Sequence, residues 1–248
     1  MLSAHLQTEF STVGHLDLAT QLCQNGFARV RLIDKSKLAI LQSQLALIQQ
    51  TSTFRFPPEE GPVIYDSNKR DCFRILFHVA RGCLSLLLPV ETDEHVKRLR
   101  QKLNRSVEQK LFHNPNAPFS QEQSFSGSFF NLFHYDHGCL NTHRDRYLIT
   151  VIAVLPPADG VNRSALWVKS PLRGWQNADQ IVAADELLVF VGEEMAQLST
   201  TWPSPLPAVE HCIRVDPNGE RIPHSHHRRD PMTPQTGNRC SIALVLGE

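Results

Sequence analysis

The second half of this 248-residue chain is dominated by short apolar segments rich in β-branched and aromatic residues, with turn residues between them. Many such segments without a helical pattern between them are typical of a β-sandwich, a jelly roll or a barrel. The predicted strands are SFFNLFHY (128–135), YLITVIAVL (147–155), ALWVKS (165–170), ELLVFVG (186–192), AVEHCIRV (208–215) and RCSIALVL (239–246). The sequence therefore predicts a β core after residue 125.

The first half carries helical patterns instead. Leu18, Leu22 and Cys23 have helical spacing, Gly26 ends that helix, and the strand-like FARVRLI follows. A second amphipathic helix begins at Ser36, in SKLAILQSQLALIQQ. A third is predicted over residues 92–112, where Thr92 can cap the first turn and one face is apolar.

We therefore expect one domain over residues 1–248, mainly β with flanking helices. Residues 1–125 form its mostly helical N-terminal part, and residues 126–248 form the β core. Within the first part, residues 51–67 contain Phe-Pro-Pro and Gly-Pro and are predicted to be a loop.

The composition argues against several classes of protein, among them membrane-spanning and nucleic-acid-binding proteins. Apolar residues make up 41% and charged residues 20%, which is typical of a globular protein in water. The formal net charge is zero, so no long-range field favours nucleic acid or an anionic membrane. No segment approaches the roughly 20 apolar residues that span a bilayer, and no secretory signal is visible.

The six cysteines are dispersed and form no Cys-x-x-Cys pair. This usage indicates free thiols in a reducing compartment, and we expect a cytoplasmic protein. It also argues against a structural zinc site built on thiolates.

His143 and Asp145 stand two residues apart, directly before an apolar run. Side chains at i and i+2 of an extended segment point to the same face, so this pair offers one nitrogen and one oxygen donor together. His211 is the downstream histidine that falls within a strand-like segment. Two imidazoles and one carboxylate form the facial triad of non-haem Fe(II) oxygenases.

Two other interpretations of this pattern stay open. A His-x-Asp pair is often no more than a surface pair. A second one, His134 and Asp136, competes for the metal, although a turn follows it rather than a strand.

Arg239 and Ser241 also lie at i and i+2, on the last predicted strand. A guanidinium binds a carboxylate through two hydrogen bonds, and the hydroxyl adds a third. Burying an arginine in a strand is costly unless an anion lies beside it. The alternative is an arginine on an edge strand in water.

These motifs, in this order, resemble the isopenicillin N synthase-like branch of the Fe(II)/2-oxoglutarate-dependent oxygenases. LFHYDHGCLNTHRDRYLITVI is similar to the family's segment around its His-x-Asp pair, and GWQNADQIVAADELLVFVGEEMAQLST to the segment that follows. EHCIRV and RCSIALVL are similar to its signatures around the second histidine and the Arg-x-Ser pair. LATQLCQNGFARVRLI resembles its N-terminal helix and strand, so the likeness covers most of the chain.

The resemblance implies a double-stranded β-helix (jelly roll, cupin-like) core packed against N-terminal helices. It implies that His143, Asp145 and His211 are the catalytic ligands of Fe(II), and that Arg239 and Ser241 hold the co-substrate 2-oxoglutarate. Tyr135 matches a family tyrosine that assists there, although Asp136 replaces the proline that usually follows it.

The implied activity is an O₂-dependent dioxygenase reaction. It would hydroxylate or otherwise oxidise a small molecule, such as an amino acid or a specialised metabolite, with release of succinate and CO₂. We expect no membrane or nucleic-acid partner. Nucleic-acid demethylases of this superfamily carry a second arginine where this chain has Val245.

Two alternatives remain: an Fe(II) oxidase of the isopenicillin N synthase type that does not use 2-oxoglutarate, and a non-catalytic jelly-roll binding protein. The connection between the second histidine and the Arg-x-Ser pair is longer than in the family pattern. Residues 216–238 form a long connection rich in histidine and arginine, which could recognise an anionic substrate or be a solvated loop.

Overall fold

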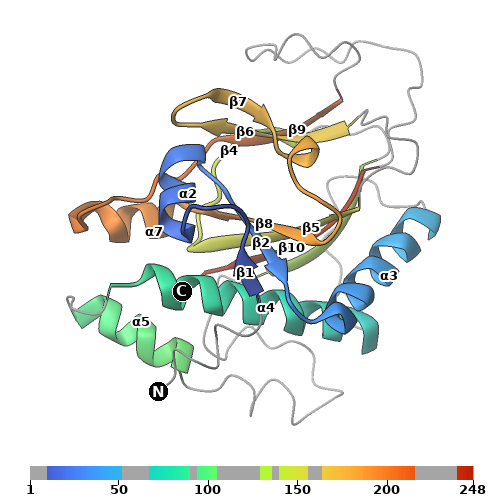
Figure 1. The fold of residues 1–248 in the computed structure, drawn as a ribbon, viewed down its shortest axis with the longest axis horizontal. Coiled ribbons are helices and arrows are strands. Elements are labelled where there is room, and N and C mark those ends of the chain that lie inside the picture. Colours follow the sequence, from blue (N-terminus) through green and yellow to red (C-terminus); the bar gives the residue numbers. More distant parts are fainter. Residues whose placement is uncertain are drawn as a thin grey trace.

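Two antiparallel sheets face each other in the computed structural model, and helices cover the outer side of the larger sheet (Figure 1). The structure describes residues 10–51, 67–89, 94–104, 129–135, 140–155, 164–215 and 239–247. The larger sheet has the strand order β1-β2-β8-β5-β10-β3, and the smaller sheet has the order β4-β9-β6-β7.

The strands are β1 (Phe10–Thr12), β2 (Ala28–Leu32), β3 (Phe129–Tyr135), β4 (Leu140–His143), β5 (Ile149–Leu155), β6 (Ser164–Ser170), β7 (Gly174–Asn177), β8 (Glu186–Val191), β9 (His211–Val215) and β10 (Arg239–Leu246). The helices are α2 (Leu18–Asn25), α3 (Lys35–Thr51), α4 (Ser67–Leu87), α5 (Glu94–Asn104) and α7 (Glu193–Leu198), with the short 3₁₀ turns η2 (Ala178–Gln180) and η3 (Ser199–Thr201).

From β3 onward the chain passes back and forth between the two sheets. β3, β5, β8 and β10 belong to the larger sheet, whereas β4, β6, β7 and β9 belong to the smaller one. Among these described strands only β6 and β7 are consecutive in one sheet, where they pair as an antiparallel hairpin. This winding is consistent with a jelly roll. The six predicted strands are all confirmed, and β4 and β7 are additions to them.

Side chains of successive residues in the larger sheet point alternately to its two faces and pack in two separate hydrophobic clusters. Cys240, Ile242 and Leu244 of β10 pack in the cluster that includes the helices, whereas Ala243 packs in the cluster between the sheets. Successive residues of a strand point to opposite faces, so one sheet contributes to both cores. Arg239 and Ser241 share the parity of Ala243 and therefore belong to the face between the sheets.

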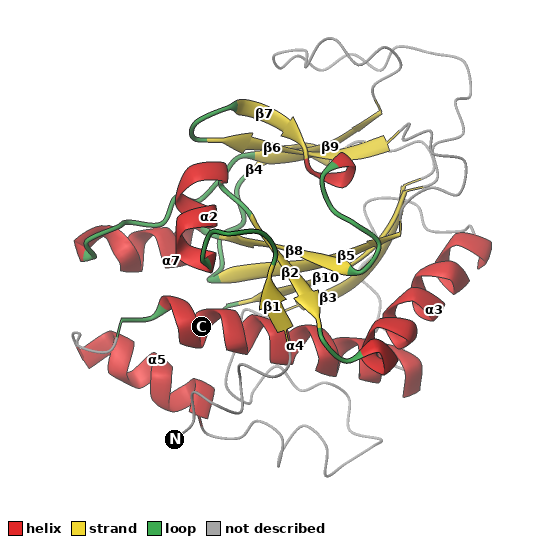
Figure 2. Ribbon diagram, viewed as in Figure 1, coloured by secondary structure: helices red, strands yellow, loops and turns green. Residues whose placement is uncertain are grey.

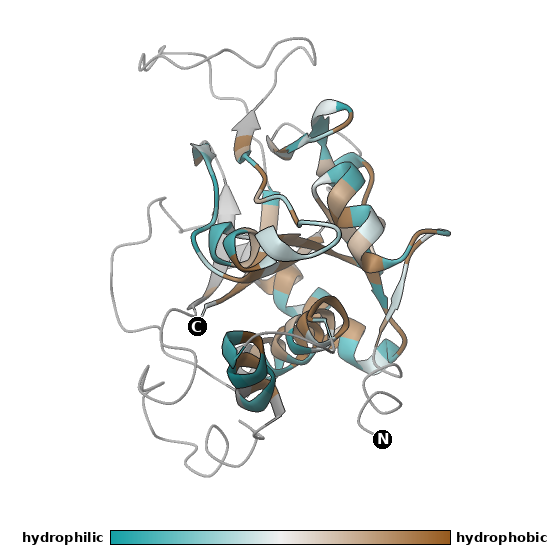
Figure 3. Cartoon of the chain, turned by 90° about the vertical axis from the view of Figure 1, so that its left-hand side faces the viewer, coloured by the Kyte–Doolittle hydropathy of each residue, from teal (hydrophilic) through white to brown (hydrophobic). Residues whose placement is uncertain are grey.

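The helices supply the outer cover (Figure 2). α3 and α4 run beneath the larger sheet (Figure 1), and their buried apolar residues belong to the same hydrophobic cluster as those of the sheet. Hydrophobic and hydrophilic residues both occur along the helices (Figure 3). The second predicted helix is confirmed as α3. The third is confirmed over Glu94–Asn104, while its cap at Thr92 and its extension to residue 112 lie outside the described residues. α4 is not among the predicted helices, and most of the predicted loop at 51–67 lies outside the described part.

The predicted first helix and strand are confirmed as α2 and β2. Asp17 caps α2 by accepting a hydrogen bond from the backbone N–H of Thr20 at 2.8 Å. The helix ends at Gly26, whose φ of 79° favours glycine. β2 then pairs with β8, so the N-terminal part of the chain extends the larger sheet.

Among the described residues, the cysteines 23, 72, 83, 212 and 240 form no disulfide. Cys139 lies outside them. None of the helices described here combines the length and apolar character that crossing a membrane requires.

The capping contact predicts a modest effect on stability. Asp17→Ala removes the acceptor for the Thr20 amide and should lower the free energy of unfolding by about 1 kcal/mol. Asp17→Ser keeps an acceptor and should recover most of this loss. Urea denaturation of the three proteins measures it, and an unchanged midpoint for Asp17→Ala would contradict the capping role.

Candidate metal centre

Three side chains from separate parts of the fold meet between the sheets. His143 is the last residue of β4, His211 is the first of β9, and the two are paired across these antiparallel strands. Asp145 follows β4 in the connection to β5. His143, Asp145 and His211 each offer one ligand atom, and these atoms lie within 4.8 Å of one another.

The sequence-based expectation for His143 and Asp145 needs one adjustment. The pattern predicts that both lead directly into the following strand, but His143 ends the strand before it and Asp145 lies in the link between β4 and β5. The link carries the carboxylate from the smaller sheet toward the larger one. The two side chains still converge, with His143 Nε2 3.5 Å from Asp145 Oδ1.

Both imidazoles present the same nitrogen to the carboxylate. His211 Nε2 also lies 3.5 Å from Asp145 Oδ1. The Nδ1 atoms face backbone carbonyls, at 2.8 Å from Asn141 O for His143 and 3.2 Å from Val209 O for His211. A carbonyl only accepts hydrogen bonds, so each Nδ1 carries a proton. When a ring gives up its other proton, the lone pair therefore lies on Nε2, the atom that faces Asp145.

The larger sheet holds the second oxygen of Asp145. Thr150 on β5, which is buried, donates its hydroxyl to Asp145 Oδ2 at 2.5 Å. Burial raises the pKa of Asp145, but hydrogen bonds from His143 and His211, the charge of His211 and the Thr150 hydroxyl outweigh it and hold the pKa below its usual value. The carboxylate is therefore ionised, the form that binds a metal.

The N-terminus of α7 holds the chain at Asp145 and just after it. The backbone N–H of Glu193 donates to the carbonyl of Asp145 at 2.7 Å, and that of Gly192 to the carbonyl of Leu148 at 3.1 Å. The approach is so close that a Cβ on Gly192 would lie 2.0 Å from the carbonyl oxygen of Tyr147 and 2.7 Å from that of Asp145. Only glycine fits between this helix and the Asp145 link.

The three ligands are unequally exposed. The side chain of His211 is 5% exposed and packs against Phe190 of β8, with ring centroids 4.6 Å apart. The side chain of Asp145 is 13% exposed and that of His143 is 36% exposed. Solvent therefore reaches the cluster from the side of His143, whereas the side of His211 is buried.

The structure places Arg239 and Ser241 together on the inner face of β10. Nη1 of Arg239 donates to Oγ of Ser241 at 2.8 Å, and both residues are buried. A carboxylate within the chain also binds this guanidinium. Asp179 on η2 accepts from Nε at 2.5 Å and from Nη2 at 3.0 Å.

Tyr135 is the direct partner of Arg239 across the β3–β10 ladder, so its backbone lies beside that of the arginine. The competing pair separates differently. His134 belongs to β3, opposite Cys240, and Asp136 lies outside the described residues, as does the segment 216–238.

Three contributors to this region are absent from the residues that the sequence predicts: Thr150, Asp179 and Gly192. Asp179 acts on a residue 60 positions away, Gly192 acts through its close approach to a backbone, and Thr150 acts on a residue of the link before its strand; none belongs to a local motif. The sequence gives a hint only of Gly192, which occupies the glycine of the VGEEM segment after β8.

Comparison with known proteins gives weak likenesses. No family model and no curated protein matches the chain. A C-terminally truncated protein of Neurospora crassa in apo form is 14% identical over 93% of this chain and 86% of that one, with a TM-score of 0.44. A Pseudomonas putida prolyl-4-hydroxylase is 14% identical over 100% and 94%, with a TM-score of 0.41.

The full-length form of the same Neurospora crassa protein, in complex with alpha-KG, is also 14% identical, over 98% of this chain and 63% of that chain, with a TM-score of 0.36. At identities of 14% and TM-scores of 0.36 to 0.44, these likenesses decide neither the fold nor the function of this chain.

The close approach at Gly192 predicts a specific defect. Gly192→Ala should push the Asp145 link away from α7 and weaken binding of Mn(II) by about tenfold or more, because ligand geometry is lost. Gly174→Ala is the control: Gly174 has a φ of 70° and open space around it, so alanine there strains the backbone far from the cluster. Isothermal titration with Mn(II) should separate the two, and equal losses would contradict this role of Gly192.

Metal affinity should depend on pH through His143. Its hydrogen bond to Asp145 raises the pKa of His143 above its usual value of 6.5, although burial opposes this. A protonated imidazole cannot bind a metal, so the affinity for Mn(II) should fall as pH decreases through the raised pKa and level off above it. Histidine NMR of the metal-free protein gives the pKa. An affinity that stays constant from pH 8 to pH 5 would contradict the assignment.

Proposed function

We propose that this protein is a non-haem Fe(II)- and 2-oxoglutarate-dependent oxygenase of a small-molecule substrate. In this proposal His143, Asp145 and His211 hold the iron, and Arg239 and Ser241 bind the distal carboxylate of 2-oxoglutarate, with Tyr135 beside them. The observation that carries the proposal is the convergence of the two Nε2 atoms and one carboxylate oxygen.

The donor set fits a metal ion of this kind. Metal–ligand bonds of about 2.0–2.2 Å place adjacent donor atoms roughly 3 Å apart, and each Nε2 lies 3.5 Å from Asp145 Oδ1. Both rings are fixed by backbone carbonyls in the tautomer that a metal needs. Two nitrogens and one oxygen suit iron, and three protein ligands leave positions for other molecules.

The location of Arg239 fits a bridging acid. Its partner Asp179 is bonded to the N–H of Leu166, while His211 is paired with Val168, two residues along the same strand. Two residues of a strand span about 7 Å. A short dicarboxylic keto acid is of comparable length, which supports placing it between the triad and the guanidinium.

Iron bound there would supply the redox chemistry with O₂ that amino-acid side chains cannot provide. The residues of the chain bind and orient. Thr150 fixes the carboxylate of Asp145, the carbonyls of Asn141 and Val209 fix the rings, and the apolar residues between the sheets exclude water from the buried side.

We also propose that β3, β10, β5 and β8 facing β4, β9, β6 and β7 form a double-stranded β-helix. β1 and β2 extend the larger sheet, and the whole chain is taken as one oxygenase domain. The alternation of successive strands between the sheets supports this assignment.

One observation favours a second candidate function. Asp179 already occupies two nitrogens of Arg239, and an oxidase that does not use 2-oxoglutarate would have no need of that guanidinium for a co-substrate. Coupled release of succinate distinguishes the two candidates, because only the first produces it.

The proposal predicts how two substitutions differ. His143→Ala removes a ligand and should abolish both Mn(II) binding and O₂-dependent succinate release from 2-oxoglutarate. Arg239→Ala should leave Mn(II) bound but raise the 2-oxoglutarate concentration needed for half-maximal release by at least about tenfold. Succinate is measured with Fe(II), in the absence of substrate and with a panel of amino acids.

His15→Ala is the control, since His15 is exposed on the segment before α2 and should behave like the wild type. Undiminished metal binding in His143→Ala would refute the ligand assignment. Metal binding without succinate in the wild type would favour the oxidase candidate.

A further inference from the structure

Asp179 and Arg239 form a buried ion pair beside the proposed iron site. Each side chain is only 3% exposed, and two hydrogen bonds of 2.5 and 3.0 Å join the carboxylate to the guanidinium. We propose that Asp179 is a fixed counter-ion of Arg239, which stabilises the acid-free protein and weakens and filters the binding of carboxylates there. This inference rests on the proposed function, because it concerns the acid that Arg239 is proposed to bind.

Asp179 is held in place independently of the arginine. Its Oδ2 also accepts a hydrogen bond from the backbone N–H of Leu166 on β6, at 2.9 Å. The turn that carries it is capped by Asn177, whose side chain accepts from the N–H of Gln180. The carboxylate is therefore tied to the smaller sheet while the guanidinium belongs to the larger one.

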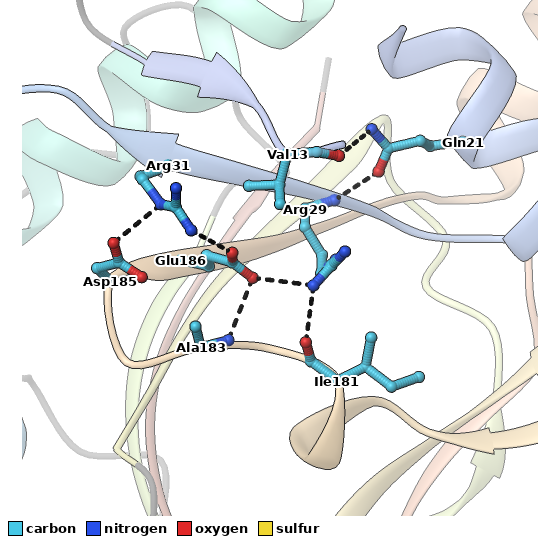
Figure 4. Close-up of polar contacts among 8 residues, drawn as sticks. All are labelled: Val13, Gln21, Arg29, Arg31, Ile181, Ala183, Asp185 and Glu186. Atoms are coloured by element: carbon cyan, nitrogen blue, oxygen red, sulfur yellow. Dashed lines mark hydrogen bonds and ion pairs between the residues drawn. The ribbon is translucent and has the colours of Figure 1, made fainter. Parts of the chain in front are cut away.

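A second polar network holds the other end of the η2 turn (Figure 4). Nη1 of Arg29 donates to the carbonyl of Ile181 at 2.9 Å and also pairs with the buried carboxylate of Glu186. Glu186 in turn accepts from the backbone N–H of Ala183. Because hydrogen bonds hold both ends of the turn, we expect Asp179 to keep its position when an acid binds. This favours a fixed counter-ion over a side chain that moves aside.

Asp179 has two opposite energetic effects: it stabilises the acid-free protein, and it weakens the binding of an acid. A buried arginine without a counter-charge is strongly unfavourable, so Asp179 stabilises the protein when no acid is bound. When an acid binds Arg239, its carboxylate lies close to the carboxylate of Asp179, which is bonded to the same guanidinium. Like charges within about 4–6 Å disfavour each other by tenfold or more in an equilibrium constant.

A consequence for specificity follows. The Asp179–Arg239 pair is formally neutral, so attraction to a carboxylate alone gives little affinity. A keto acid gains a second attachment by chelating the metal, whereas succinate lacks the keto group. The pair therefore favours acids that bind at both ends, and Asp179 is a specificity determinant rather than a catalytic residue.

The test compares acid binding by Mn(II)-loaded wild type and Asp179→Asn, using 2-oxoglutarate and succinate as separate probes in calorimetric titrations. The asparagine keeps an acceptor for the Leu166 N–H but carries no charge. We expect 2-oxoglutarate to bind about tenfold tighter or more, and succinate to gain at least as much. The acid-free variant should melt about 5 °C or more lower.

Asp71→Asn is the control. It also removes a carboxylate that pairs with an arginine, Arg74 at 3.2 Å, but on α4, which covers the outer side of the larger sheet. It should leave both acid affinities within about twofold, so that the loss of one negative charge elsewhere is separated from the loss of this one counter-ion.

A double variant covers the case in which Asp179→Asn does not fold. Asp179→Asn with Arg239→Gln replaces the pair with neutral side chains and should melt near the wild type but bind no acid. A double variant that also fails to fold overturns the counter-ion role.

The remaining outcomes separate this inference from the proposed function. If the wild type binds 2-oxoglutarate and Asp179→Asn binds it equally or more weakly, the inference is wrong and the proposed function stands. If the wild type binds no acid but Asp179→Asn does, the inference is supported and the proposed use of 2-oxoglutarate fails. If neither protein binds either acid, both fail.

Discussion

The carboxylate of Asp145 is fixed from two directions, and the arrangement of the site follows from that. Its side chain is bonded to Thr150 of the larger sheet, while its own carbonyl accepts the first amide of α7. His143 and His211 come from the smaller sheet. The two layers therefore meet at this residue, and the position of a bound ion depends on how they are spaced as much as on the ligands themselves.

Much of this arrangement could be read from local patterns. Short apolar segments between turn residues predicted the strands, and His-x-Asp and Arg-x-Ser each predicted two side chains on one face. Asp145 and Arg239 confirm the value of this spacing, since each contacts the partner expected from it. α4 is absent from the predicted elements, although Cys72, Leu76, Val79 and Cys83 are buried at helical spacing. Its first turn, residues 67–70, contains no apolar residue, so the apolar spacing becomes visible only further along the chain.

The remaining features could not be read locally. Asp179 looks like an ordinary turn residue, and only the fold brings it to an arginine 60 positions away. Thr150 is one β-branched residue in a run of them, and the function of its hydroxyl depends on the link before it. Gly192 has an ordinary φ, so its requirement is set by a neighbouring backbone. In each case the deciding contact is made between elements, which spacing along the chain does not encode.

Solvent exposure increases from the buried His211 to His143, so one side of the site lies in the core and the other at the surface. The buried imidazole is fixed by the Phe190 ring behind it, so it is the ligand that changes least, whereas the imidazole at the rim is in contact with water. Loading and loss of an ion should therefore proceed stepwise over the rim, with the outer ring binding last and leaving first. A chelator in solution would compete at this outer imidazole, so the lifetime of the proposed metal-loaded protein would be set at its surface rather than in its core.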